Sequence, residues 1–276
     1  MHFQAAMRKN SIILVWITVS ALCLTVIAGL FMPGAGKDWP RPGGFVRNAA
    51  IAVREENRLS LRHGSYYIAG VTEDSIYLAD RLSPARLLVA HRHLREYGER
   101  PFDTPPFDYR SMAISVDSPY FQLADAVSGH ILQGDMRSLR PDRSVTGIPF
   151  LSAVPATGSS AALVCLYNRE NTLAKAVFGE DGATPFPSVI EKQIDGIFCS
   201  EGQLAFDRQH RQIAYVYKYR NTYVLLDTGF KVIAEGHTID TNSRAKLAVQ
   251  ATADNEFSLR KRAPIVNKRS YIHGGR

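Results

Sequence analysis

The fold of this chain is decided by residues 195–240, which read DGIFCSEGQLAFDRQHRQIAYVYKYRNTYVLLDTGFKVIAEGHTID. Four short apolar segments follow one another here, at 204–206, 213–219, 223–226 and 232–234. The residues between them are turn formers such as Asn, Asp and Gly. β-Branched and aromatic runs punctuated in this way are typical of antiparallel strands joined by short turns. The stretch therefore predicts a four-stranded antiparallel meander, the size of one propeller blade.

The second of these segments has two distinct faces. Because side chains alternate across a strand, the odd-numbered positions from 213 to 219 lie on one face and carry one isoleucine and three tyrosines. The even-numbered positions from 214 to 220 carry Ala, Val, Lys and Arg. The tyrosine row predicts packing between neighbouring blades, and the alternative interpretation is a ligand-binding face.

Similar units recur along the chain and indicate its architecture. Apolar segments are centred near residues 78, 123, 164 and 215, and the triplet Leu-Ala-Asp occurs at both 78–80 and 123–125. A period of about 40–50 residues with several strands in each unit is typical of a β-propeller rather than a sandwich. We therefore predict an all-β, propeller-like array of antiparallel four-stranded blades. The alternative is a generic antiparallel protein in which the spacing is accidental.

Loops and an incomplete last unit complete this picture. The Pro-rich stretches 101–109, 141–150 and 179–187 are interpreted as loops between blades. Segments at 247–250, 257–259 and 264–266 resemble the start of a fifth unit. We therefore expect an incomplete ring, and we expect its unpaired sheet edges to favour self-association.

An uncharged stretch near the N-terminus predicts a membrane anchor. Ser11 to Met32 contains 22 residues without a charge. At about 1.5 Å per residue, this helix would be long enough to cross a hydrocarbon core of roughly 30 Å. A cleaved signal peptide and a buried soluble helix are the alternatives. Because Arg8 and Lys9 precede the span, the positive-inside rule keeps the N-terminus in the cytoplasm.

The predicted organisation is a cytoplasmic tail (1–10), a single transmembrane helix (11–32), a Pro/Gly-rich stalk (33–44) and a propeller-like exported domain (45–276). This predicts a single-pass protein of the inner (cytoplasmic) membrane with most of the chain on the periplasmic side. The lipid bilayer is then one partner, through residues 11–32. The net charge is +7, and the basic residues are scattered. The chain carries no nucleic-acid-binding motif, so nucleic acid is not an expected partner.

The three cysteines give no metal motif, because no Cys-x-x-Cys pair is present. Cys23 falls in the expected span. Cys165 and Cys199 are either small buried hydrophobic residues or, in an oxidising compartment, a disulfide pair.

Several stretches resemble a family of uncharacterised bacterial proteins with one N-terminal anchor and an exported, TolB-like six-bladed propeller. They are Ser65–Gly70, Asp117–Phe121, Gln193–Cys199, Tyr215–Tyr217, Thr238–Thr241 and Val266–Ser270. The resemblance implies a propeller over residues 65–270 and no known activity. Members of the family continue beyond the Asn-Lys-Arg-Ser stretch for a further blade, whereas this chain departs from them at Tyr271, as a C-terminally truncated member would.

Catalytic motifs are not found. The sequence contains no Gly-x-Ser-x-Gly, no His-Glu-x-x-His and no phosphate-binding Gly loop. We therefore predict no catalytic residue, no metal site and no cofactor. The best binding candidates are polar residues at strand ends, where turn formation and backbone capping are the alternative roles: Asp195, His237, Asp240, Asn267 and Arg269.

Two classes of function follow from these observations. The first is a membrane-anchored binding or scaffold module with a protein partner on the propeller face. The second is a propeller-type hydrolase or lactonase acting on a small exported substrate. An enzyme requires three or more polar side chains that converge on the propeller axis, whereas an apolar or blocked axis favours the module.

Overall fold

The computed structural model describes residues 16, 18–25, 54–103, 112–247, 249–251, 257–259, 263–272 and 274–275. The chain divides into two compact units, Met1–Arg41 and Pro42–Arg276. In the first unit, residues 16 and 18–25 are helical. Among the described residues, no helix has the length and apolar character needed to cross a membrane. The rest of the expected span 11–32 lies outside the described residues, as do the tail 1–10 and the stalk 33–44, so these assignments stay predictions.

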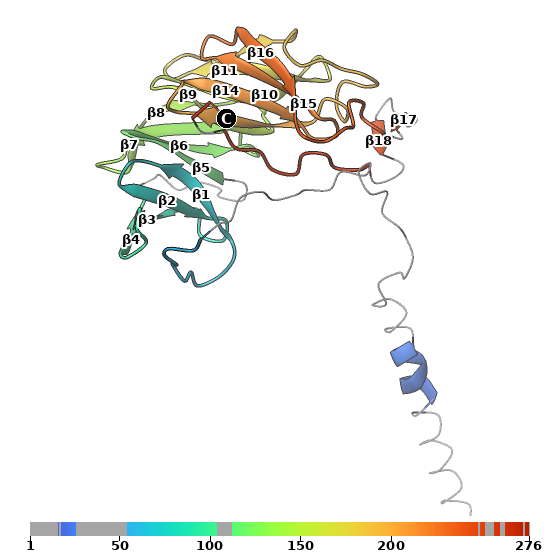
Figure 1. Ribbon diagram of the computed structural model, residues 1–276, viewed down its shortest axis with the longest axis horizontal. Coiled ribbons are helices and arrows are strands. Elements are labelled where there is room, and N and C mark those ends of the chain that lie inside the picture. The colour runs from blue at the N-terminus through green and yellow to red at the C-terminus, as the bar shows by residue number, and fades with distance from the viewer. Residues whose placement is uncertain are drawn as a thin grey trace, which may run out of the picture. The chain divides into compact units, whose positions relative to one another are not determined.

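The second unit is an all-β propeller with four antiparallel four-stranded blades, each built from consecutive strands (Figure 1). Blade 1 contains β1 (Tyr66–Val71), β2 (Ser75–Asp80), β3 (Arg86–His91) and β4 (Tyr97–Pro101). Blade 2 contains β5 (Met112–Asp117), β6 (Tyr120–Asp125), β7 (His130–Asp135) and β8 (Arg140–Val145). Blade 3 contains β9 (Ser152–Thr157), β10 (Ser160–Tyr167), β11 (Glu170–Val177) and β12 (Thr184–Phe186). Blade 4 contains β13 (Gly202–Asp207), β14 (Gln212–Tyr217), β15 (Thr222–Asp227) and β16 (Val232–His237).

The meander predicted from residues 195–240 is blade 4, and the four repeats are the four blades. The predicted centres near 78, 123, 164 and 215 fall in β2, β6, β10 and β14, the second strand of each blade. A two-stranded sheet of β17 (Val249–Ala251) and β18 (Phe257–Leu259) follows. Over the described ranges there are thus four complete blades and one incomplete sheet, which differs from the six blades that the family resemblance implies.

All three expected interblade loops are wrong in part, because they contain residues of outer strands. Within 101–109, Pro101 ends β4, and residues 104–109 lie outside the described ranges. Within 141–150, residues up to Val145 belong to β8, and within 179–187 the short strand β12 pairs with β11. Proline lacks an N–H and is therefore tolerated on an edge strand. Pro141 and Pro185 both lie on such edge strands. Because proline is typical of loops, the sequence predicted loops where these edge strands lie.

Hydrophobic cores form between successive blades. One core joins blades 1 and 2 around Leu87 and Phe121, and a second joins blades 2 and 3 around Ile131 and Leu163. The core between blades 3 and 4 contains Ile213, Tyr215 and Tyr217 together with Leu173. Tyr215 and Tyr217 therefore pack between blades, as predicted, whereas Tyr219 packs with Cys199 and Ala245 in a separate cluster. Both Cys165 and Cys199 are buried and free in this structure, and the Cys199 thiol donates a hydrogen bond to the carbonyl oxygen of Asp195.

The innermost strands of the blades meet around a common axis. β1 contacts β5, β5 contacts β9, and β9 contacts β13. The approach of β1 to β5 is close at Gly70, where an added Cβ would lie 2.3 Å from the carbonyl oxygen of Val116. The absence of a side chain at this position therefore sets the spacing between blades 1 and 2.

Replacing Gly70 by Ala tests this close approach. The methyl group has no space between the two backbones, so we expect Gly70→Ala to lower the free energy of unfolding by about 1–3 kcal/mol. Gly98→Ala is the matched control, since an added Cβ at Gly98 meets no atom within 4 Å. The control should change stability by less than about 1 kcal/mol, in the stabilising direction. Chemical denaturation of both variants measures the difference, and equal effects would contradict this explanation.

Candidate functional site

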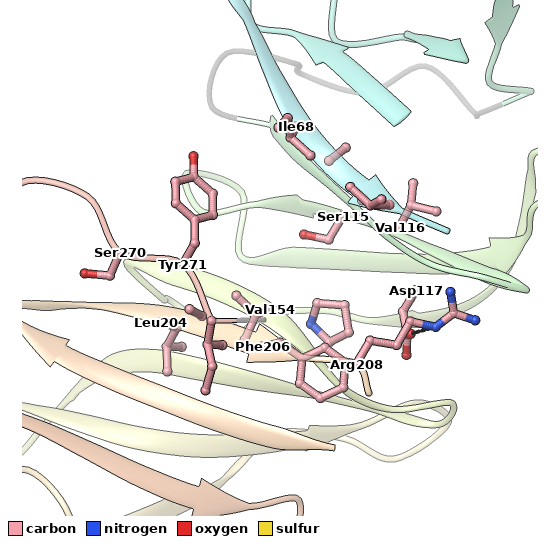
Figure 2. A pocket seen from close by; sticks show the side chains of 16 residues that line it. Ile68, Ser115, Val116, Asp117, Val154, Leu204, Phe206, Arg208, Ser270 and Tyr271 are labelled. Atoms are coloured by element: carbon pink, nitrogen blue, oxygen red, sulfur yellow. Dashed lines mark ion pairs between the residues drawn. The ribbon is translucent and has the colours of Figure 1, made fainter. Parts of the chain in front are cut away.

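A cavity of about 480 Å³ lies on the propeller axis. It is lined by β1, β5, β9 and β13, the innermost strands of all four blades, and by Ser270–Ile272 (Figure 2). The volume falls within the range of ligand pockets, about 300–1,000 Å³. Because every blade contributes to it, the cavity is a direct product of the repeat architecture.

The lining of the cavity is mainly apolar. Ile68, Val116, Val154, Leu204 and Phe206 contribute side chains to it. In addition, Ile68 and Val71 of β1 are half exposed, at 53% and 50%. Tyr271 lines the cavity as well and is 73% exposed. Exposed apolar side chains that gather at one cavity are a feature of binding sites.

An ion bridge joins three blades beside this cavity. The Asp117 carboxylate, at the end of β5, lies 3.0 Å from Nε of Arg208 and 2.9 Å from Nη1 of Arg211. Both arginines lie in the turn after β13. Arg211 also donates a hydrogen bond of 2.9 Å to the carbonyl oxygen of Ala156, and Arg208 donates to that of Ser118. The bridge therefore ties blade 4 to blades 2 and 3.

The chemistry that this cavity offers is limited. Its carboxylate, Asp117, is already paired with two guanidinium groups, so it is not free to act as a general base. Over the described part of the chain, no group of three or more His, Cys, Asp and Glu side chains is placed to hold a metal ion. The mainly apolar lining favours binding over hydrolysis.

The sequence-predicted candidates lie away from the cavity, and three of them bind backbone groups. Asp195 is buried and accepts hydrogen bonds from the N–H groups of Ile197, Phe198 and Cys199. It thereby caps the turn that leads to β13. This is the structural role that the sequence left open beside ligand binding.

Asp240 and Asn267 are brought together around the β14–β15 turn. The carbonyl oxygen of Asp240 accepts a hydrogen bond of 2.6 Å from Nδ2 of Asn221. Nδ2 of Asn267 donates to the carbonyl oxygens of Tyr217 and Arg220, at 2.8 and 2.9 Å. The side chains of Asn221 and Asn267 therefore join segments that are distant in sequence. The Asp240 carboxylate instead accepts hydrogen bonds from the N–H and Nδ2 of Asn242, two residues away, at 2.8 and 2.9 Å.

His237 and Arg269 complete the set of candidates, and both are exposed. His237 ends β16, and Arg269 lies in the segment beside β13. None of the five candidates lines the axial cavity. Asp117, Arg208 and Arg211 were missed because residues 91 and 94 positions apart carry no local signal of their contact.

A serine, a histidine and an aspartate also meet at the start of blade 1. Ser65 Oγ lies 2.5 Å from both Nδ1 of His63 and Oδ1 of Asp80, and His63 Nε2 lies 3.5 Å from Oδ2 of Asp80. In a nucleophilic triad, the carboxylate orients the histidine and does not bind the serine. Here Ser65 donates to the carboxylate itself, and Asp80 also caps the N–H of Leu82. The cluster therefore fastens a loop to the end of β2.

Comparison with known proteins identifies no family. No family model and no curated protein matches the chain. Among solved structures, a DUF4221 family member from Bacteroides vulgatus is 10% identical over 71% of this chain and 64% of its own, with a TM-score of 0.49. The propeller domain of Cps50 (Swd1) from Myceliophteria thermophila is 11% identical over 72% and 63%, with a TM-score of 0.42. Hydrazine synthase from Kuenenia stuttgartiensis is 12% identical over 66% and 50%, with a TM-score of 0.38.

The chain thus spans half to about two-thirds of the length of these structures. At this level of similarity, the propeller assignment rests on the four sheets and their packing. The resemblance to the anchored, TolB-like family has no family match behind it and stays a prediction.

Asp207 holds the C-terminal residues against blade 4. Its carboxylate is almost fully buried and accepts hydrogen bonds from the N–H groups of Gln209 and Gly275, at 2.9 and 2.7 Å. The His210 ring lies 3.0 Å away. Burial raises the pKa of Asp207, but the hydrogen bonds from Gly275, His210 and Gln209 outweigh it, so the pKa is lower than in the unfolded chain.

Because the pKa of Asp207 is lower in the folded protein, the free energy of unfolding decreases as the pH falls. The contribution is fully present above the unfolded pKa of about 4 and is lost as the pH falls through the folded value. Unfolding measured between pH 6 and 2 should therefore show a smaller acid-induced loss of stability in Asp207→Asn than in the wild type. Asp181→Asn, at an exposed position, should follow the wild type. Parallel curves for wild type and Asp207→Asn would rule out this role.

Proposed function

We propose that this protein is a binding module whose axial cavity takes an apolar ligand or an apolar part of a partner. The observation that carries the proposal is the cavity of about 480 Å³ between the four blades, with Ile68, Val71 and Tyr271 exposed beside it. Transfer of apolar surface from water into such a cavity is favourable by roughly 25 cal/mol per Å². Among the described residues that line the axial cavity, the converging polar groups that a hydrolase or lactonase requires are not found.

We further propose that the module is anchored in the cytoplasmic membrane through residues 11–32 and works on the extracytoplasmic side. The support is the uncharged 22-residue stretch and the flanking Arg8 and Lys9. A module held in this way would present its propeller face to partners near the membrane surface.

The cavity can be tested with 1-anilinonaphthalene-8-sulfonate, an apolar fluorescent probe that bears one anionic group. The full-length protein in lipid nanodiscs should show a saturable fluorescence increase above that of protein-free nanodiscs. Two carboxylates placed among the apolar side chains should disfavour the probe. We expect the double variant Ile68→Asp and Val71→Asp to bind at least about tenfold more weakly, which corresponds to about 1.4 kcal/mol.

The matched control is Leu82→Asp with Ile239→Asp, two exposed apolar residues that do not line the cavity. This variant should bind the probe like the wild type. If the wild type and both double variants bound the probe equally, the probe would be bound outside the cavity and the cavity proposal would be wrong.

The anchor proposal makes a separate expectation. In spheroplasts, externally added protease should degrade the part after residue 32 and should leave an N-terminal epitope tag protected. A cytoplasmic marker protein controls for intact membranes. Protection of the whole chain, or its recovery in a soluble fraction, would contradict the proposed topology.

A further inference from the structure

Residues 263–272 run beside blade 4 and are fixed to it at one end. The N–H groups of Val266 and Asn267 donate to the carbonyl oxygen of Lys218, at 2.9 and 3.1 Å. The Asn267 side chain binds two further carbonyl oxygens of the same turn. This end of the segment is therefore seated on the β14–β15 turn.

The side-chain amide of Gln203 then holds the backbone of the segment. Its Nε2 donates to the carbonyl oxygens of Asn267 and Lys268, at 3.4 and 2.7 Å, and its Oε1 accepts from the N–H of Ser270, at 3.1 Å. Gln203 lies in β13, the innermost strand of blade 4. A side-chain amide that donates to and accepts from a neighbouring backbone replaces the contacts of a paired strand.

The direction of the segment follows from its contacts. Residues 267–270 meet Gln203 near the start of β13, and Gly275 meets Asp207 at its end. The segment therefore runs parallel to β13 and reaches the axial cavity through Ser270–Ile272. This is the place that the innermost strand of a next blade would take, so the segment resembles the first strand of a fifth blade.

The other edge of this segment is open within the described part of the chain. No hydrogen bond between described residues uses the N–H or carbonyl of Arg269 or Tyr271. The side chains of Lys268, Arg269 and Tyr271 are exposed. A segment whose backbone groups are unpaired along one edge can accept an added strand.

The positive charge of the sequence around this edge favours a negatively charged partner segment. Residues 260–276 contain six Lys and Arg and no Asp or Glu. A partner segment that pairs with this edge is favoured if it carries carboxylates, because complementary charges speed encounter and fix the register.

We propose that the free edge of residues 268–272 binds an extended acidic segment of a partner protein. The partner segment would pair with it by backbone hydrogen bonds, as the second strand of a fifth blade. Its side chains would alternate, and its carboxylates would meet Lys268 and Arg269. This edge adjoins the axial cavity, because Ser270–Ile272 also line it.

The test uses the full-length protein in nanodiscs of neutral lipid and a fluorescein-labelled probe peptide of sequence Glu-Thr-Glu-Val-Glu-Thr-Glu. We expect saturable binding by fluorescence anisotropy that weakens as salt is raised. A peptide of the same sequence, N-methylated at every second residue, cannot donate along one edge and should bind at least tenfold more weakly. The double variant Lys268→Glu and Arg269→Glu should also lose at least tenfold in affinity.

The control variant is Arg92→Glu with Arg95→Glu, which makes the same change in charge at exposed positions of blade 1. It should bind the probe peptide like the wild type. The N-methylated comparison on wild-type protein keeps the proposal testable if the charge reversal alters folding.

Three outcomes would overturn the proposal. Equal affinity for the N-methylated and unmodified peptides would show binding by charge alone. Displacement of both peptides by phosphatidylglycerol vesicles would identify an anionic lipid as the occupant. Loss of peptide binding as the protein dimerises would show that a second copy of this chain covers the edge.

Discussion

The placement of blade 4 depends on one buried charge, the guanidinium of Arg220 in the β14–β15 turn. The side chain is 1% exposed and lies over the Tyr217 ring, with Cζ 3.7 Å from the ring centroid. It donates to the carboxylate and to the carbonyl oxygen of Glu191, at 2.9 and 3.0 Å. Burial of a charge is unfavourable unless hydrogen bonds and an opposite charge compensate for it. The Glu191 carboxylate is itself 72% exposed, so only the guanidinium has lost its water.

The β14–β15 turn also binds chain segments that precede and follow blade 4. Glu191 belongs to the connection from blade 3, and the backbone of Asn221 is bound by Asn242 and Thr238 in the connection that leaves blade 4. Lys218 receives the segment that begins at Val266. Because these contacts hold the connection that enters blade 4 and the connection that leaves it, they also hold β13 in place at the axis. The cavity and the open edge of residues 268–272 both depend on that position.

The fold could be predicted because its signals are local, whereas the site could not. Strand alternation, turn residues and the repeat interval all lie within short windows, so blade 4 and its tyrosine face followed from the sequence. Arg220 shows the limit, because alternation placed it opposite the tyrosines, yet it lies past the end of β14 and turns back over Tyr217. The contact of Asp117 with Arg208 is also beyond reach, since it arises only when blades 2 and 4 meet near the axis.

The two surfaces on which a partner would bind differ in the kind of interaction that they offer. The axial cavity offers apolar area, and the Asp117 carboxylate in its described lining is paired with arginines, so a ligand would be selected there by shape and size rather than by charge. The edge of residues 268–272 offers backbone donors and acceptors flanked by cations, which select direction, register and charge. A partner that used both would gain affinity mainly from the cavity and specificity mainly from the edge. Because the two meet at Tyr271, such a partner needs only a short acidic strand that is followed by an apolar residue.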